Sequence, residues 1–234
     1  VLLLVHVELL VVLIFVLCNF LGFSQPKLDS LLLELNNTVD RESKIEIFLK
    51  LAQVAEESDV SLEYAQSAFD QLNENDDLFL KGKAYQSLGR SYVNEQQTDS
   101  ALIYLAQSLA IFDSLEITRH SAKNLYYQAI AFEQIHLFDS ARSRYHLAIL
   151  LSDSIGDDAS SAYYRLHLGD LLNTKGDNVG ALKHLKIAHE YYNAPERADS
   201  AWISYNSLAI VYDEMGLYPE ALGYYLKAYE IIEN

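Results

Sequence analysis

The sequence predicts an all-α protein, built as an α-solenoid of about five antiparallel helical hairpins. Half of its 234 residues are apolar, yet the chain holds only 9 Gly and 3 Pro. This scarcity of helix-breaking residues favours long helices over a loop-rich β fold. A second observation is an internal repeat, because four similar segments follow one another in a constant register. Together these observations predict stacked helical units.

The repeat is anchored by alanines at intervals of 40 residues, at Ala101, Ala141, Ala181 and Ala221. Small or apolar residues recur four and seven positions after most anchors, which places the three positions on one face of a helix. A weaker first copy continues the register at Ser61, Ala65 and Ala68.

A second helix precedes each anchor and carries a small residue of its own, at Gly89, Ala129, Gly169 and Ala209. We expect the small residues to let the two helices of a hairpin approach closely. One hairpin alone cannot bury all of these apolar faces, so neighbouring hairpins must stack into a continuous core. Pro219 falls in the first turn of its helix, where a missing N–H costs little.

The clearest copy of the pattern comprises Leu208, Ala209, Tyr212, Gly216, Tyr218, Ala221, Tyr225 and Ala228. It resembles the tetratricopeptide repeat (TPR), and the resemblance covers about residues 40–234. The usual period of that family is about 34 residues, so a period of 40 predicts helices that are longer by roughly one turn. The resemblance implies a right-handed superhelix. The register sets the copies at about 40–76, 77–116, 117–156, 157–196 and 197–234, after a lead-in segment at 25–39. Leu49 replaces a small residue in the first copy, which suggests an N-terminal cap.

Residues 1–24 differ in composition from the rest of the chain. The run from Leu9 to Leu17 is apolar without interruption, and small residues at Gly22 and Ser24 fit cleavage by signal peptidase after Ser24. These features predict a signal peptide and an exported, periplasmic protein. An uncleaved anchor that faces the array to the periplasm is the alternative, although Glu8 lies within the apolar stretch and argues against a well-formed span.

Several classes of function are disfavoured by composition and motifs. A net charge of −16 repels nucleic acids and anionic lipids, so we expect membrane contact only through the N-terminal segment. The single Cys18 cannot form an intramolecular disulfide. Metal-binding, nucleotide-binding and hydrolase motifs are absent from the sequence. We therefore expect no cofactor, no metal, no catalytic residue and no enzymatic activity.

The TPR resemblance implies a concave groove, lined by the first helix of each hairpin, that grips a peptide. Carried over position by position, the groove residues are Lys83, Gln86, Arg90, Asn94, Lys123, Tyr126, Glu133, Tyr163, Asp170, Asn173, Asn206 and Asp213. This wall is basic towards its N-terminal end and acidic towards its C-terminal end. An ordinary solvated face is the alternative interpretation. The basic clamp by which some TPR proteins hold a terminal carboxylate is not reproduced.

The sequence thus predicts a protein–protein interaction module whose partner is a peptide or a protein. The last copy ends at Asn234 without a polar capping helix, and the chain is similar to exported bacterial TPR proteins and to the input regions of bacterial sensors. We expect it to be the extracytoplasmic input part of a larger signalling protein. The alternatives are a stand-alone periplasmic scaffold, or the targeting part of an enzyme whose catalytic domain lies beyond Asn234. The oligomeric state stays open.

Overall fold

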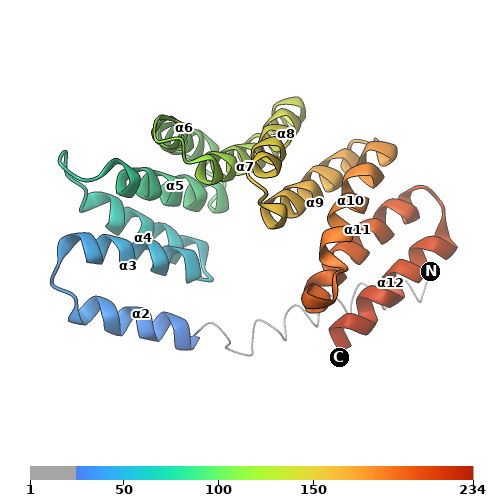
Figure 1. The fold of residues 1–234 in the computed structure, drawn as a ribbon, viewed down its shortest axis with the longest axis horizontal. Helices are drawn as coiled ribbons and strands as arrows, with labels where there is room; N and C mark the ends of the chain where they lie inside the picture. Colours follow the sequence, from blue (N-terminus) through green and yellow to red (C-terminus); the bar gives the residue numbers. More distant parts are fainter. Residues whose placement is uncertain (1–24, 234) are drawn as a thin grey trace. The chain divides into compact units, whose positions relative to one another are not determined.

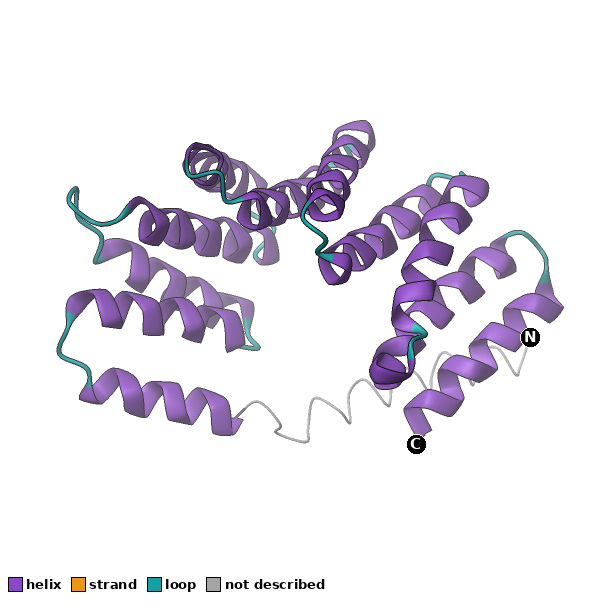
Figure 2. Ribbon diagram, in the orientation of Figure 1, coloured by secondary structure: helices purple, strands orange, loops and turns teal. Residues whose placement is uncertain are grey.

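The computed structural model describes residues 25–233, so the predicted signal peptide or anchor at 1–24 lies outside the described residues. Every regular element within this range is a helix (Figure 2). The α-helices are α2 (Gln25–Asn37), α3 (Arg41–Val54), α4 (Ser58–Asp70), α5 (Leu78–Asn94), α6 (Thr98–Ser114), α7 (Thr118–Gln134), α8 (Phe138–Ser154), α9 (Asp158–Thr174), α10 (Asn178–Tyr192), α11 (Ala201–Glu214) and α12 (Tyr218–Glu233). A short 3₁₀ helix, η1 (Pro195–Ser200), separates α10 from α11.

The helices pack as consecutive antiparallel hairpins, which confirms the all-α prediction (Figure 1). The chain divides into two compact units, one ending at Leu72 and the other running from Asn73 to Asn234. The first unit holds α2, α3 and α4, and the second holds α5 to α12. None of the described helices is both long enough and apolar enough to cross a membrane.

In the first unit, the lead-in segment forms a helix of its own, a structure that the sequence analysis did not assign. Leu31 of α2 is buried against Ile47 and Leu51 of α3. The hairpin of α3 and α4 is closed by the Ser61 hydroxyl, which donates to the carbonyl oxygen of Ala52 at 2.7 Å. Helix α2 therefore covers one apolar face of α3.

In the second unit, the helices follow a period of 20 residues rather than 40. They begin at residues 78, 98, 118, 138, 158, 178 and 218, and only α11 leaves this register. Six helices of the unit end in a residue with a left-handed φ between 55° and 79°, namely Gln96, Glu116, His136, Gly156, Gly176 and Gly216. The following N–H bonds back to the last turn, as from Asp157 to the carbonyl oxygen of Ser152 at 2.9 Å. This is the Schellman type of helix end, and η1, which begins at Pro195, replaces it before α11.

Close packing inside the hairpins depends on glycine. A Cβ added at Gly89 would lie 2.5 Å from Leu105 Cγ, and one at Gly169 would lie 2.5 Å from Leu185 Cγ. The small residue of the first helix thus packs against the residue four positions after the alanine anchor. This is a refinement of the expected contact between small residues, since the anchor Ala101 is itself fully buried.

Neighbouring hairpins are joined by buried polar contacts. The Asn124 side chain of α7 accepts from Gln86 Nε2 at 3.0 Å and donates to Ser108 Oγ at 2.9 Å. Ser108 in turn donates to the carbonyl oxygen of Gly82 at 2.8 Å. The amide and hydroxyl groups of α5, α6 and α7 are satisfied in this way without water, which fixes the register between two hairpins.

Candidate functional site

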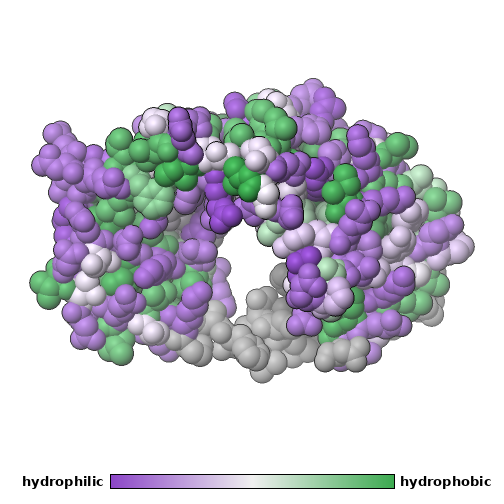
Figure 3. All heavy atoms as spheres, in the orientation of Figure 1, coloured by the Kyte–Doolittle hydropathy of each residue, from purple (hydrophilic) through white to green (hydrophobic). Residues whose placement is uncertain are grey.

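The first helices of the hairpins in the second unit form a continuous surface, which we call the inner wall and define as α5, α7, α9 and α11. Helix α5 contacts α7 and α9 contacts α11, in addition to the contacts within hairpins. Figure 1 shows α7 and α9 on the inner side of this unit, with α6 and α8 on its outer side. On the face drawn in Figure 3, hydrophilic and hydrophobic residues are interspersed.

Tyrosine rings gather where α7 meets α9. The Tyr126 ring stacks on the Tyr164 ring at 4.7 Å between centroids, with an angle of 19° between the planes. Its centroid also lies 5.4 Å from that of Tyr163 and 5.2 Å from that of His167. The local reason is the sequence pair Tyr163–Tyr164, which presents one ring to the core and one to solvent. Tyr164 is 5% exposed and Tyr163 is 44% exposed.

A chain of hydrogen bonds links these rings. The Tyr126 hydroxyl donates to the Tyr163 hydroxyl oxygen at 3.2 Å and contacts Nε2 of His167 at 3.0 Å. Burial lowers the pKa of the His167 imidazole to about 4, so the ring is neutral near pH 7. Because Tyr126 spends its one proton on Tyr163, its oxygen accepts from an Nε2–H of His167. The order of donors is therefore His167, Tyr126, Tyr163.

This cluster opens into a pocket of about 480 Å³. Its walls come from α7 and α9, from the turn before α9, and from the end of α10, and its lining residues are Arg119, Lys123, Tyr126, Tyr127, Asp157, Ala159, Ser160, Tyr163, Tyr164 and Tyr192. The volume lies within the range of about 300–1,000 Å³ that is typical of ligand sites. We call it the tyrosine pocket.

Charge is distributed unevenly along the inner wall. Burial, reinforced by the nearby Arg90 guanidinium, lowers the pKa of the Lys123 ammonium on α7. At the far ends of α7 and α9, burial raises the pKa of the Glu133 carboxyl, and it raises that of Asp170 to about 6. Glu133 accepts a hydrogen bond from the Tyr145 hydroxyl at 3.0 Å. Asp170 keeps contact with solvent while crowded by neighbouring atoms, with Glu133 adding to its shift and Ser207 opposing it.

The structure places all twelve predicted groove residues on the four helices of the inner wall. It brings together Lys123, Tyr126 and Tyr163 in the tyrosine pocket. The others lie along the wall outside this pocket, with Asn94 and Asp170 exposed and Lys83, Arg90, Glu133, Asn173, Asn206 and Asp213 half-buried.

Two predicted groove residues differ from the expectation that they face open space. Gln86 is 6% exposed, and its amide is occupied by Asn124 and by His120. Tyr126 is 5% exposed and forms the floor of the pocket beneath Tyr163. The family positions mark the inner side of a helix, but here the next hairpin covers part of that side.

Other pocket residues were not predicted. Tyr127, Tyr164, Tyr192 and Arg119 line the pocket, and His167 supports its floor. The sequence analysis interpreted tyrosines at such spacings as packing residues. The doublets Tyr126–Tyr127 and Tyr163–Tyr164, 37 residues apart, are the feature of the sequence from which the cluster could have been found.

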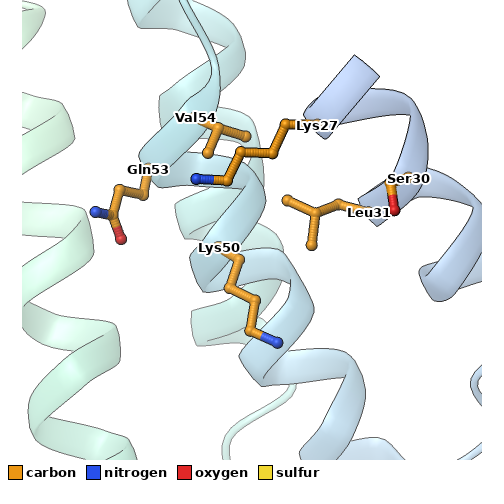
Figure 4. Close-up of a pocket in the computed structure, with 6 residues that line it drawn as sticks. All are labelled: Lys27, Ser30, Leu31, Lys50, Gln53 and Val54. Carbon is orange, nitrogen blue, oxygen red and sulfur yellow. The ribbon is translucent and has the colours of Figure 1, made fainter. Parts of the chain in front are cut away.

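A second pocket, of about 390 Å³, lies in the first unit between α2 and α3. Figure 4 shows Lys27 and Leu31 reaching from α2 towards α3, which contributes Lys50, Gln53 and Val54. Within residues 25–233, no three His, Cys, Asp or Glu side chains lie together as metal ligands would.

Comparison with known proteins shows the fold but not a family. No protein-family model matches the chain, and no curated protein matches it. Among solved structures, a Rap protein in complex with Competence and Sporulation Factor has a TM-score of 0.76 at 16% identity, covering 90% of this chain and 60% of that chain. BtubC from P. vanneervenii has a TM-score of 0.70 at 17% identity, covering 90% and 88%.

A putative kinesin light chain from Podosopora anserina, with nearly identical TPR-like repeats, has a TM-score of 0.61 at 16% identity. The match covers 83% of this chain and 97% of that chain. The structure of this protein is therefore similar to those of TPR-like repeat proteins. Such a fold generally serves as a protein–protein interaction module.

Proposed function

We propose that residues 73–234 form a protein–protein interaction module that holds a segment of a partner protein along the inner wall. The observation that carries this proposal is the tyrosine pocket, a concave site on that wall which combines aromatic rings with charged groups. Tyrosine and arginine are enriched at the energetic centres of protein interfaces. The similar Rap protein was solved in a complex with a protein factor, which supports a partner of the same kind.

The rigid framework around the pocket favours binding without large rearrangement. Tyr126 and Tyr164 are buried and stacked, and Tyr145 is fully buried beneath them. A site whose rings are already ordered loses little conformational entropy when a ligand binds. Partner capture by this module would therefore depend on the surface of the wall and not on the folding of a loop.

The proposal extends to the setting of the chain. The apolar residues 1–24 and the small residues before Gln25 support export, with the module outside the cytoplasm as the input part of a signalling protein. A fusion of residues 1–30 to alkaline phosphatase would test this. Enzyme activity in the periplasm supports export, and activity that stays absent overturns it.

The binding role is tested by selecting ligands from a random dodecapeptide library on the immobilised full chain. The selected peptides are then titrated calorimetrically into Tyr163→Ala and into the control Leu147→Ala. Leu147 is 41% exposed on α8, on the outer side of the unit. We expect Tyr163→Ala to weaken binding roughly tenfold, as the loss of a contact at an interface centre does.

The control should bind as the unchanged protein does. Peptides that bind Tyr163→Ala normally but lose affinity for Leu147→Ala would place the binding surface on the outer helices. A library that yields no peptide at all, over repeated selections, would contradict a peptide-binding module.

A further inference from the structure

Lys123 is a half-buried cation without an ion pair to any carboxylate in residues 25–233. Its ammonium lies 6.0 Å from the centroid of the Tyr127 ring. Burial and the Arg90 guanidinium both disfavour its charged form and lower its pKa. An ammonium that has lost water without gaining a carboxylate is stabilised when a ligand supplies an anion.

The other charged groups of the tyrosine pocket already have partners. Arg119 Nε lies 3.0 Å from Asp157 Oδ2, and the same carboxylate accepts from the Ser160 hydroxyl at 3.0 Å. Asp157 also caps the N-terminus of α9 by accepting from the Ser160 N–H. Its negative charge is thus balanced within the protein, and it leaves Lys123 as the cation of the pocket whose charge is open to a ligand.

A hydroxyl donor points the same way. The donor chain runs from His167 through Tyr126 to Tyr163, so the Tyr163 oxygen is an acceptor within the protein. Its own proton is then left for a group outside the chain, and Tyr163 is 44% exposed. A neutral hydroxyl of this kind donates well to an anion and poorly satisfies a cation.

We propose that the tyrosine pocket receives an acidic side chain of the partner, an aspartate or glutamate, beside the Lys123 ammonium and the Tyr163 hydroxyl. Apolar residues that flank the acidic one rest on the surrounding tyrosine rings. One open cation matches a singly charged carboxylate better than a doubly charged phosphate. This inference rests on the proposed function and names the chemistry of the partner at one subsite.

The probes are three dodecapeptides with blocked ends, each a fourfold repeat of a triplet. The acidic probe repeats Asp-Phe-Gly, the amide probe Asn-Phe-Gly and the basic probe Lys-Phe-Gly, and a phosphoserine version of the acidic probe is the fourth. Blocked ends remove the terminal carboxylate, so only side chains carry charge. Each probe is titrated calorimetrically into the full chain.

The variants are Lys123→Met, which keeps the length of the side chain, and Lys123→Arg, which keeps the charge. Lys175→Met is the matched control, because the Lys175 ammonium also lies over an aromatic ring, 4.1 Å from the Phe138 centroid, but outside the pocket. Circular dichroism confirms that each variant is folded before titration.

We expect the acidic probe to bind at least roughly tenfold more tightly than the amide probe, and Lys123→Met to abolish this preference. Lys123→Arg and Lys175→Met should retain it. Equal binding of the acidic and amide probes, a preference that survives Lys123→Met, or tighter binding of the phosphoserine probe would each overturn the inference. The library-selected peptides separate the two levels: if they bind the inner wall while the acidic preference is missing, the proposed function stands and the acidic subsite does not.

Discussion

Gly89 lies directly against Leu105, and a methyl group on its Cα would approach Leu105 Cγ to 2.5 Å. The same relationship recurs one repeat later between Gly169 and Leu185. These contacts join the two helices of a hairpin where a side chain on the first helix has no room. The spacing of the hairpin therefore depends on the missing Cβ.

Gly89→Ala is expected to destabilise the second unit by about 1–3 kcal/mol, because overpacking forces Leu105 or the helices apart. Urea unfolding followed by circular dichroism measures the change. Gly223→Ala is the control, since a Cβ there meets no atom within 4 Å, and the better helix propensity of alanine should leave it as stable or slightly more stable. Equal stability of Gly89→Ala and the unchanged protein would show that the helices are not in close contact.

The left-handed residues at the helix ends give a paired prediction. Glu116 has a φ of 55°, which costs a residue with a side chain about 1 kcal/mol. Glu116→Gly should therefore raise the free energy of unfolding by about 0.5–1 kcal/mol. Gly156→Ala should lower it by about the same amount, and only through the backbone, because a Cβ at Gly156 meets nothing within 4 Å. Thermal unfolding of the two variants checks whether the shifts have opposite signs.

Much of the fold could be predicted because the alanine anchors record helix packing directly. The half-period of 20 residues was missed for a physical reason. Glycine marks the left-handed position at Gly156, Gly176 and Gly216, but Gln96, Glu116 and His136 occupy the same position elsewhere. A residue that tolerates strain leaves no trace in composition.

The candidate site was predictable in part. Position along a helix identifies the side that faces inwards, which located Lys123 and Tyr163. It does not reveal hydrogen bonds between repeats, and Gln86 finds its partners His120 and Asn124 from the next hairpin. The burial of Gln86 could be known only once two hairpins were placed side by side.

Asn124 is expected to be the most sensitive polar residue of that contact. It is fully buried, and Asn124→Ala would leave the Gln86 and Ser108 side chains without a partner. A loss of about 2–3 kcal/mol is expected from unsatisfied buried polar groups. Exposed Asn94 provides the control, and Asn94→Ala should change stability by less than about 0.5 kcal/mol. Chemical unfolding of both variants decides whether the network contributes as described.

The His167 imidazole predicts a dependence of stability on pH. Its pKa is lowered by burial to about 4, from the usual value of 6.5. Between these values the unfolded chain binds a proton that the native protein does not, so His167 reduces stability as the pH falls from 6.5 towards 4. Asp170, whose raised pKa acts in the opposite direction, is common to both proteins in the comparison.

His167→Gln should accordingly lose less stability than the unchanged protein when the pH is lowered from 7 to 5. Urea unfolding at the two pH values measures the difference. A titration followed by NMR provides a direct check, in which the ring resonance of His167 should stay in its neutral position at pH 5. A midpoint near 6.5 would contradict burial of the ring.

Hydrogen exchange resolved along the chain, with and without a library-selected peptide, shows directly which surface binds. If the inner wall holds the peptide, amide exchange should slow in α5, α7 and α9, most strongly around Tyr126 and Tyr163. Exchange in α6 and α8 should change little. Protection confined to α6 and α8, with the inner helices unaffected, would contradict binding along the inner wall.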